Sequence, residues 1–175
     1  MSGWFQTYTG KKVYPLEMTP NDICIEDIAH SLSLQCRFSG HSGVFYSVGQ
    51  HSVLVANNCP KHLRLKGLLH DASEAYLVDI PRPLKNLPEF SLYRKFEEKI
   101  QNTIFGKYGL SDGIPDEVHY ADNLLLATEA RILLGKLLPG WNPVTPYLKE
   151  EILPLCPADA EKLFLDSFSK FKKGE

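Results

Sequence analysis

Residues 68–74 read Leu-Leu-His-Asp-Ala-Ser-Glu, and they set two polar side chains, His70 and Asp71, into an apolar helical pattern over about 61–76. A buried imidazole or carboxylate needs a partner, and a metal ion satisfies both. Adjacent helical residues point about 100° apart, so both side chains can face one point beside the helix. An isolated His-Asp pair more often forms a structural hydrogen-bond cluster, so a metal site needs further ligands.

Two more polar residues interrupt apolar helical patterns elsewhere in the chain. His51 lies in a predicted helix over about 45–56, and Cys59-Pro60 then turns the chain. An antiparallel pair of helices would bring His51 within reach of the same ion as the His-Asp pair. Asp122 lies in a predicted helix over about 116–134 and is a fourth candidate ligand. Taken alone, each of these residues also fits a hydrogen-bonded core group, and Asp122 also fits a surface charge.

The remaining patterns predict an all-α fold. A glycine turn at Thr9-Gly10-Lys11 between aromatic and β-branched runs predicts a small β-hairpin over residues 4–16. Residues 78–83 contain two prolines and are expected to be non-helical, and residues 138–146 read as a proline-rich loop. We expect residues 1–175 to form a single domain, a bundle of six or seven helices that includes segments near 25–32, 45–56, 61–76, 91–108, 116–134 and 157–171.

Composition excludes several classes of function. The chain has 175 residues, of which 43% are hydrophobic, and a net charge of −2, so it lacks the basic surface expected for nucleic acid polymers. No apolar run approaches the roughly 18 residues of a membrane span, and no signal peptide is apparent. Its four cysteines are scattered without CxxC spacing. We therefore expect a cytoplasmic protein with reduced thiols and no membrane partner.

Together these segments resemble the HD-domain phosphohydrolase superfamily. The resemblance covers about residues 25–134 and is carried by residues 50–56 (Gln-His-Ser-Val-Leu-Val-Ala), 69–74, 79–85 (Asp-Ile-Pro-Arg-Pro-Leu-Lys) and Asp122. The chain is most similar to bacterial 5′-deoxynucleotidases and to small phage-type HD nucleotide (dNTP) phosphohydrolases. The resemblance implies an HD-domain helical bundle and one divalent metal ion bound by His51, His70, Asp71 and Asp122.

The predicted ligand set suits a d-block ion. Two histidines and two carboxylates favour Mn, Co, Fe or Zn, with Mg also possible. Such an ion lowers the pKa of a bound water and neutralises phosphoryl oxygens. Glu74 lies three and four residues after the His-Asp pair and shares their face. The resemblance implies that Glu74 is the general acid or base; the alternative is a surface glutamate without a role.

Other residues are candidates for substrate binding. Arg37 precedes His51 by fourteen residues, a spacing that resembles that of a phosphate-binding arginine in the deoxynucleotidases, and Lys85 offers a second cation near Asp79. We predict catalytic roles for Arg37 and Lys85 besides Glu74, although surface positions are the alternative for both cations. The other predicted substrate-binding residues are Phe38, which replaces a tryptophan of the deoxynucleotidases and leaves a 2′-deoxy preference open, Asp79, and His119, which precedes Asp122 by three.

The predicted reaction is hydrolysis at the α-phosphorus of a (deoxy)nucleotide 5′-phosphate. It would release nucleoside with phosphate from a dNMP or with triphosphate from a dNTP, and the sequence leaves both open. The alternatives are a cyclic-nucleotide or other phosphodiesterase and a non-catalytic nucleotide-sensing module. We also expect a homo-oligomer, because the resembling enzymes are dimers or larger rings and several aromatic residues lie outside the helical stripes, among them Trp4, Phe5, Trp141 and Tyr147.

Overall fold

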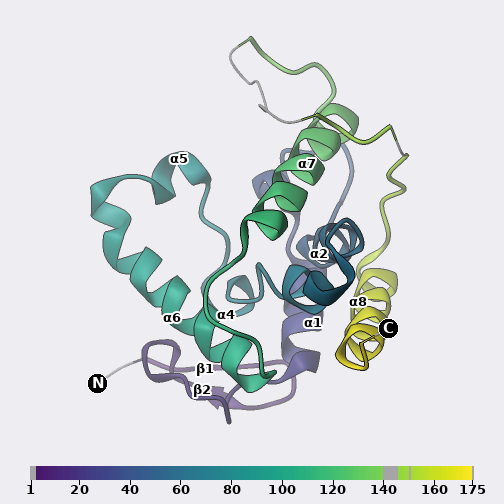
Figure 1. The fold of residues 1–175 in the computed structure, drawn as a ribbon. Coiled ribbons are helices and arrows are strands. Elements are labelled where there is room, and N and C mark those ends of the chain that lie inside the picture. Colours follow the sequence, from purple (N-terminus) through teal and green to yellow (C-terminus); the bar gives the residue numbers. More distant parts are fainter. Residues whose placement is uncertain (1–2, 140–145, 150, 175) are drawn as a thin grey trace.

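The computed structural model describes residues 3–139, 146–149 and 151–174, and within them it has eight α-helices and one two-stranded sheet (Figure 1). The predicted all-α fold with a small N-terminal β-hairpin is confirmed. The elements are β1 (Phe5–Gln6), β2 (Lys12–Val13), α1 (Ile25–Leu34), α2 (Val48–Asn57), α3 (Arg64–Leu68), α4 (Glu74–Leu77), α5 (Arg82–Lys85), α6 (Ser91–Lys107), α7 (Asp116–Leu133) and α8 (Pro157–Lys172), with 3₁₀ turns η1 (Pro15–Glu17), η2 (Arg37–Gly40), η3 (Lys61–Leu63) and η4 (Pro88–Phe90).

The hairpin is antiparallel and pairs Phe5 with Val13. Its turn contains Gly10 at φ +85°, a conformation that glycine adopts without steric cost. Thr9 ties the turn to α1, because its backbone N–H and hydroxyl donate to the two carboxylate oxygens of Asp27 at 2.7 and 2.9 Å. The hairpin thus packs against the first helix.

Helix α2 lies at the centre of the bundle and contacts α1, α3, α7 and α8. Residues of α2 contribute to two hydrophobic clusters, one shared with α1, α3, α6 and α8 and one shared with α7. Gly49 permits the close approach to α1, since a methyl group there would lie 2.6 Å from the Ser33 hydroxyl. His51 is therefore carried on a helix that is buried on most sides.

The predicted helix over 61–76 is interrupted, which corrects the sequence-based expectation. Helix α3 ends at Leu68, and the next helix, α4, begins at Glu74. The His70 Nδ1 donates to the Gly67 carbonyl at 2.7 Å, so a side chain supplies a donor at the end of α3. Backbone N–H groups in the turn bond three residues back, as from Ala72 to Leu69 at 3.1 Å. The His-Asp pair therefore lies in a tight turn between two short helices.

Two other helix boundaries differ from the prediction. Helix α2 begins at Val48 rather than near residue 45, because the Ser47 hydroxyl accepts the Gln50 N–H at 3.0 Å and caps the helix. Helix α5 includes Arg82 and Pro83, where the two prolines had predicted a non-helical segment. Proline is tolerated in a first helical turn, which needs no intrahelical amide donors. This helix and the interrupted one explain why eight helices appear instead of six or seven.

The late loop is only partly described. Residues 138, 139 and 146 are non-helical as expected, whereas residues 140–145 of the predicted loop lie outside the described residues. Across the described ranges, no helix is both long and apolar enough to cross a membrane.

Candidate metal centre

The closeness of α2 and α3 brings the two predicted histidine ligands together. Gly67 faces α2, and a methyl group there would lie 2.8 Å from the Cys59 sulfur and 3.1 Å from the Ala56 Cα. Glycine at this point lets α3 pack directly against α2. As a result the rings of His51 and His70 lie 5.3 Å apart between centroids, which confirms the expected closeness of these helices.

The carboxylates of Asp71 and Asp122 lie beside these two rings. The Nε2 of His70 is 3.1 Å from Asp71 Oδ2, and the Nε2 of His51 is 3.2 Å from Asp122 Oδ1. The crossed distances, His51 to Asp71 and His70 to Asp122, are 3.8 and 4.0 Å. Among the described residues, His51, His70 and Asp71 offer ligand atoms that all lie within 4.8 Å of one another, so this group can hold a metal ion, whereas Asp122 falls outside it.

The orientation of both imidazoles fits such an ion. The Nδ1 of His70 faces a carbonyl, which only accepts, so Nδ1 carries a proton. The Nδ1 of His51 lies 2.7 Å from Glu129 Oε1. Neither Nε2 has a hydrogen-bond partner of good geometry among the described residues, although both atoms are buried. Two imidazoles held at Nδ1, with free Nε2 atoms aimed at shared carboxylates, form an arrangement typical of metal ligands.

The electrostatics of the centre also favour a cation. Burial opposes the charged form of His70, but Asp71 outweighs burial and raises the pKa of His70 to about 9. Burial raises the pKa of Asp71, but His70 outweighs it and holds that pKa at about 2. The pKa of Asp122 is also lowered, because contact with His51 outweighs burial. The negative potential that keeps protons on the imidazoles would act equally on a divalent cation.

Sequence reasoning missed Glu129, which is fully buried on α7. Its carboxylate accepts hydrogen bonds from His51 Nδ1 and, at 2.8 Å, from the Tyr46 hydroxyl, and its Oε2 lies 3.0 Å from Arg37 Nε. Burial opposes its ionisation, but Arg37 and His51 outweigh burial and lower the pKa of Glu129. A signal existed in the sequence, since Glu129 follows Asp122 by seven residues, two helical turns along the same face.

Arg37 reaches the centre from a strained turn. Its backbone N–H donates to the Tyr46 carbonyl at 2.8 Å, and its Nη1 lies 3.9 Å from Asp71 Oδ2. The next two residues, Phe38 and Ser39, have φ of 55° and 52°, a region that side chains disfavour. The Phe38 ring lies 5.7 Å from the Arg37 guanidinium and packs against the α2–α7 cluster.

A cavity of about 360 Å³ opens beside His70 and Asp71. Of the other predicted substrate-binding and catalytic residues, Glu74, Lys85 and His119 line it, whereas Arg37, Phe38 and Asp79 do not, and the predicted ligands His51 and Asp122 are not among its lining residues. Glu74 is 7% exposed, and burial and the charge of Asp71 raise its pKa well above the ordinary value. Among the described residues, no hydrogen bond or ion pair engages the Glu74 carboxylate.

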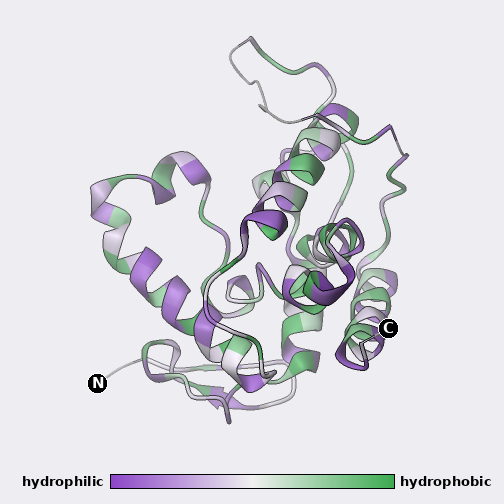
Figure 2. Ribbon diagram, in the orientation of Figure 1, coloured by the Kyte–Doolittle hydropathy of each residue, from purple (hydrophilic) through white to green (hydrophobic). Residues whose placement is uncertain are grey.

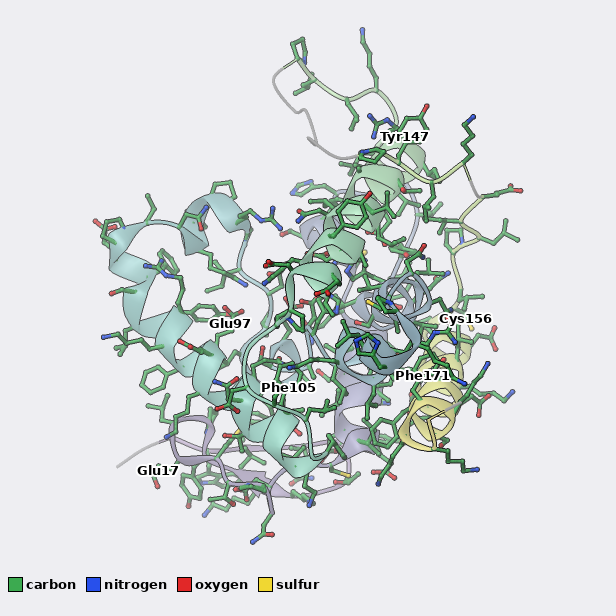
Figure 3. The ribbon with its side chains drawn as sticks, in the orientation of Figure 1. Glu17, Glu97, Phe105, Tyr147, Cys156 and Phe171 are labelled. Atoms are coloured by element: carbon green, nitrogen blue, oxygen red, sulfur yellow. The ribbon has the colours of Figure 1, made fainter. Side chains whose placement is uncertain are left out.

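The α5–α6 wall of the cavity, which we define as Lys85, Arg94, Glu97 and Glu98, differs from the predicted cationic site. The Lys85 ammonium donates to Glu97 at 2.7 Å and lies 3.6 Å from Asp79. Arg94 donates to the backbone carbonyls of Lys85 and Leu87. Both cations of this wall are therefore engaged within the protein. Glu97 projects from the middle of α6 (Figure 3).

Comparison with known proteins identifies relatives across nearly the whole chain. The chain is 41% identical over 170 residues to the uncharacterized protein YfdR of Escherichia coli K12, and the match covers 95% of this chain and 94% of YfdR. The chain belongs to the YfdR family. An uncharacterized protein of Rhodobacter capsulatus is 32% identical over 138 residues, which cover 74% of this chain and 70% of that protein. No family model matches the chain. Neither of these two relatives carries a name that assigns a function.

Proposed function

We propose that this chain is a metal-dependent phosphohydrolase that acts on the 5′-phosphate of (deoxy)nucleotides. The observation that carries the proposal is the convergence of two buried imidazole Nε2 atoms and two aspartates beside a cavity that a buried glutamate lines. The resemblance of residues 25–134 to HD-domain phosphohydrolases supplies the reaction class. The cavity volume lies at the small end of the range for ligand sites, which suits a mononucleotide.

One divalent d-block ion would be held by His51, His70, Asp71 and Asp122. Mixed imidazole and carboxylate ligands favour Mn, Co, Fe or Zn over calcium, and Mg is a further option. When bound, such an ion supplies charge neutralisation at phosphoryl oxygens and a water of lowered pKa.

The chain itself supplies a cation and a proton-transfer group. The Arg37 guanidinium lies beside Asp71, one of the proposed metal ligands. Its N–H groups would donate to the oxygens of a substrate phosphate held at the metal. Glu74 borders the same space with a carboxyl group that burial keeps protonated more readily than usual. In the proposed reaction a bond forms between water oxygen and phosphorus, and the bond from phosphorus to the 5′-oxygen breaks. Glu74 gives its proton to that leaving oxygen, or takes one from the attacking water.

The charges around the cavity favour a monophosphate over a triphosphate. The carboxylates of Asp71 and Glu98 line the space together with the Lys85–Glu97 ion pair, and Arg94 donates to backbone carbonyls of the protein. A triphosphate would bring several further negative charges against these carboxylates. We therefore place dNMP-type substrates first, with nucleoside and orthophosphate as products.

A substrate screen tests the proposed function. The full-length protein is incubated with nucleoside monophosphates, triphosphates and cyclic nucleotides in the presence of Mn²⁺, Co²⁺, Zn²⁺ or Mg²⁺, and orthophosphate, pyrophosphate and triphosphate are measured separately. We expect metal-dependent release of orthophosphate from monophosphates. Release of triphosphate alone would instead make the chain a dNTP triphosphohydrolase. The absence of release from every substrate, in protein shown to bind the metal, would reject the hydrolase.

We further propose a cytoplasmic homo-oligomer. Two of the aromatic residues that motivated this expectation are exposed, Trp4 by 55% and Tyr147 by 51%. Phe5 instead packs against the core, and Trp141 lies outside the described residues. Tyr147 lies beside α7 (Figure 3), where Arg131 covers its ring at 4.2 Å. Light scattering at micromolar concentration should show a mass above one chain, and a monomer would contradict the proposal.

A further inference from the structure

A single carboxylate, that of Glu129, joins the candidate metal centre to the candidate phosphate-binding arginine. Its Oε1 accepts from His51 Nδ1 at 2.7 Å and from Tyr46 at 2.8 Å, while its Oε2 lies 3.0 Å from Arg37 Nε. We infer that Glu129 is a positioning residue that orients the His51 ligand and holds the Arg37 guanidinium closer to itself than to Asp71. The phosphate-binding role of Arg37 in this inference rests on the proposed function. The effect of Glu129 on metal binding does not.

The first part of the role concerns His51. An ionised carboxylate can only accept, so the Nδ1 of His51 must donate to it, and Nε2 keeps its lone pair for the ion. Glu129 and His51 are both fully buried, so bulk water does not compete for the hydrogen bond between them. Without the carboxylate, the imidazole loses both its fixed orientation and its preferred tautomer.

The second part concerns Arg37. Its side chain is only 13% exposed, and two carboxylates lie near it, Glu129 at 3.0 Å and Asp71 at 3.9 Å. If Glu129 is removed, Asp71 becomes the nearest carboxylate to a guanidinium that remains charged. Arg37 would then pair more closely with Asp71 than the present 3.9 Å and compete with the metal for one of its ligands. The two effects of removing Glu129 add, and only the second depends on Arg37.

This distinction gives the role a signature that a merely structural residue lacks. Removal of a partner that orients a metal-bound histidine typically weakens metal binding by about 10–100-fold. Substitution of Arg37 in the same background should recover part of that loss, because the competing cation is gone. A buried residue that serves only the fold would show no such recovery.

The test is a titration of the metal-free full-length chain with Co²⁺, followed by its visible absorption spectrum. The variants are Glu129→Gln, Glu129→Ala, Arg37→Ala and the double variant Glu129→Ala/Arg37→Ala. The matched control is Thr128→Val, because Thr128 is also buried on α7 but bonds instead to the Leu124 carbonyl and the Leu148 N–H. Thermal unfolding of each variant checks that it is folded.

We expect Co²⁺ affinity to fall about tenfold in Glu129→Gln, which keeps an acceptor for His51, and about 100-fold in Glu129→Ala. The double variant should bind roughly tenfold more tightly than Glu129→Ala, and Thr128→Val should bind like the wild type. Folded Glu129→Ala with wild-type affinity, a double variant no tighter than Glu129→Ala, or an equal loss in Thr128→Val would each overturn the inference. The outcome stands apart from the hydrolase proposal, because Co²⁺ binding needs no turnover.

Discussion

The two sides of the candidate site are built differently. The histidine floor, which we define as His51, His70, Asp71, Asp122 and Glu129, comes from α2, α7 and the turn between α3 and α4. The α5–α6 wall stands on helices that splay away from α7 in Figure 1 and are largely hydrophilic in Figure 2. Within the described part of the chain, the floor has buried atoms without hydrogen-bond partners of good geometry, whereas the wall's lysine and arginine are engaged by the protein's own groups.

This difference separates two kinds of charged cluster. A salt bridge at an accessible wall satisfies its own charges and contributes little to stability. Buried imidazole nitrogens that lack a hydrogen bond of good geometry leave a cost that a bound cation would offset further. On the proposed function, the chemistry would take place at the histidine floor and the substrate would contact the α5–α6 wall.

The largest effect should follow from removing a ligand at the floor. His70→Ala and Asp71→Ala should each lose the bound metal, because each variant leaves only three of the four proposed ligands and three ligands hold an ion poorly. Elemental analysis of protein purified without chelator should find about one d-block ion per wild-type chain and almost none in either variant. His62→Ala is the control, since His62 is exposed on η3. Full occupancy in both ligand variants would rule out the metal centre.

Glu74→Gln should affect turnover without affecting the metal. Positioned acid–base catalysis is worth about 10²–10⁴-fold, so turnover should fall by that factor while metal content stays unchanged. Glu117→Gln is the control, because Glu117 is an exposed glutamate on α7 that does not line the cavity. Near-normal turnover would remove Glu74 from proton transfer, and loss of metal would instead make Glu74 a ligand.

The metal-free floor should lose stability as pH rises. The pKa of His70 is raised to about 9 in the folded chain, so the folded chain binds more protons than the unfolded chain above the ordinary pKa of about 6.5. The contribution is fully present below that pH and is lost as pH rises through about 9, with a magnitude on the order of 3 kcal/mol. Urea unfolding of chelated protein from pH 6 to 9.5 measures it.

The same titration in excess Co²⁺ sharpens this prediction. A metal ion displaces protons from the imidazoles, so metal binding tightens as pH rises and should offset the loss. His70→Gln should flatten the curve of the chelated protein. If the free energy of unfolding of the chelated wild type stays constant from pH 6 to 9.5, Asp71 does not raise the pKa of His70.

The sequence predicted the fold and the floor far better than the wall. Apolar periodicity gave the long helices α6, α7 and α8 within a few residues, because burial of one face determines that spacing. It missed the interruption at His70, because a histidine side chain bonded to the Gly67 carbonyl takes part in ending α3, and no helical pattern shows such a bond. It also missed Glu129, whose partners lie more than seventy residues away in the chain.

The wall shows a different limit of sequence reasoning. The sequence predicts Lys85 as a phosphate-binding cation near Asp79, and Lys85 does line the cavity. Its partner Glu97 comes from another helix, so the neutralising contact depends on how α5 packs on α6. Residue type can identify a cation, but only tertiary packing shows whether the charge is already paired.

The smallest expected effect tests whether the wall contacts substrate at all. Burial lowers the pKa of Lys85, but Glu97 and Asp79 outweigh burial and raise it, so the ammonium stays charged and paired at neutral pH. Lys85→Ala should leave metal content and kcat nearly unchanged and raise KM by roughly threefold to tenfold, the pattern of a contact made equally in ground and transition states. Lys95→Ala is the control, an exposed lysine on the same helix as Glu97. An equal rise of KM in both variants would mean that Lys85 acts on the substrate only through long-range electrostatic attraction. A large fall in kcat would give Lys85 a part in the chemistry, together with the histidine floor.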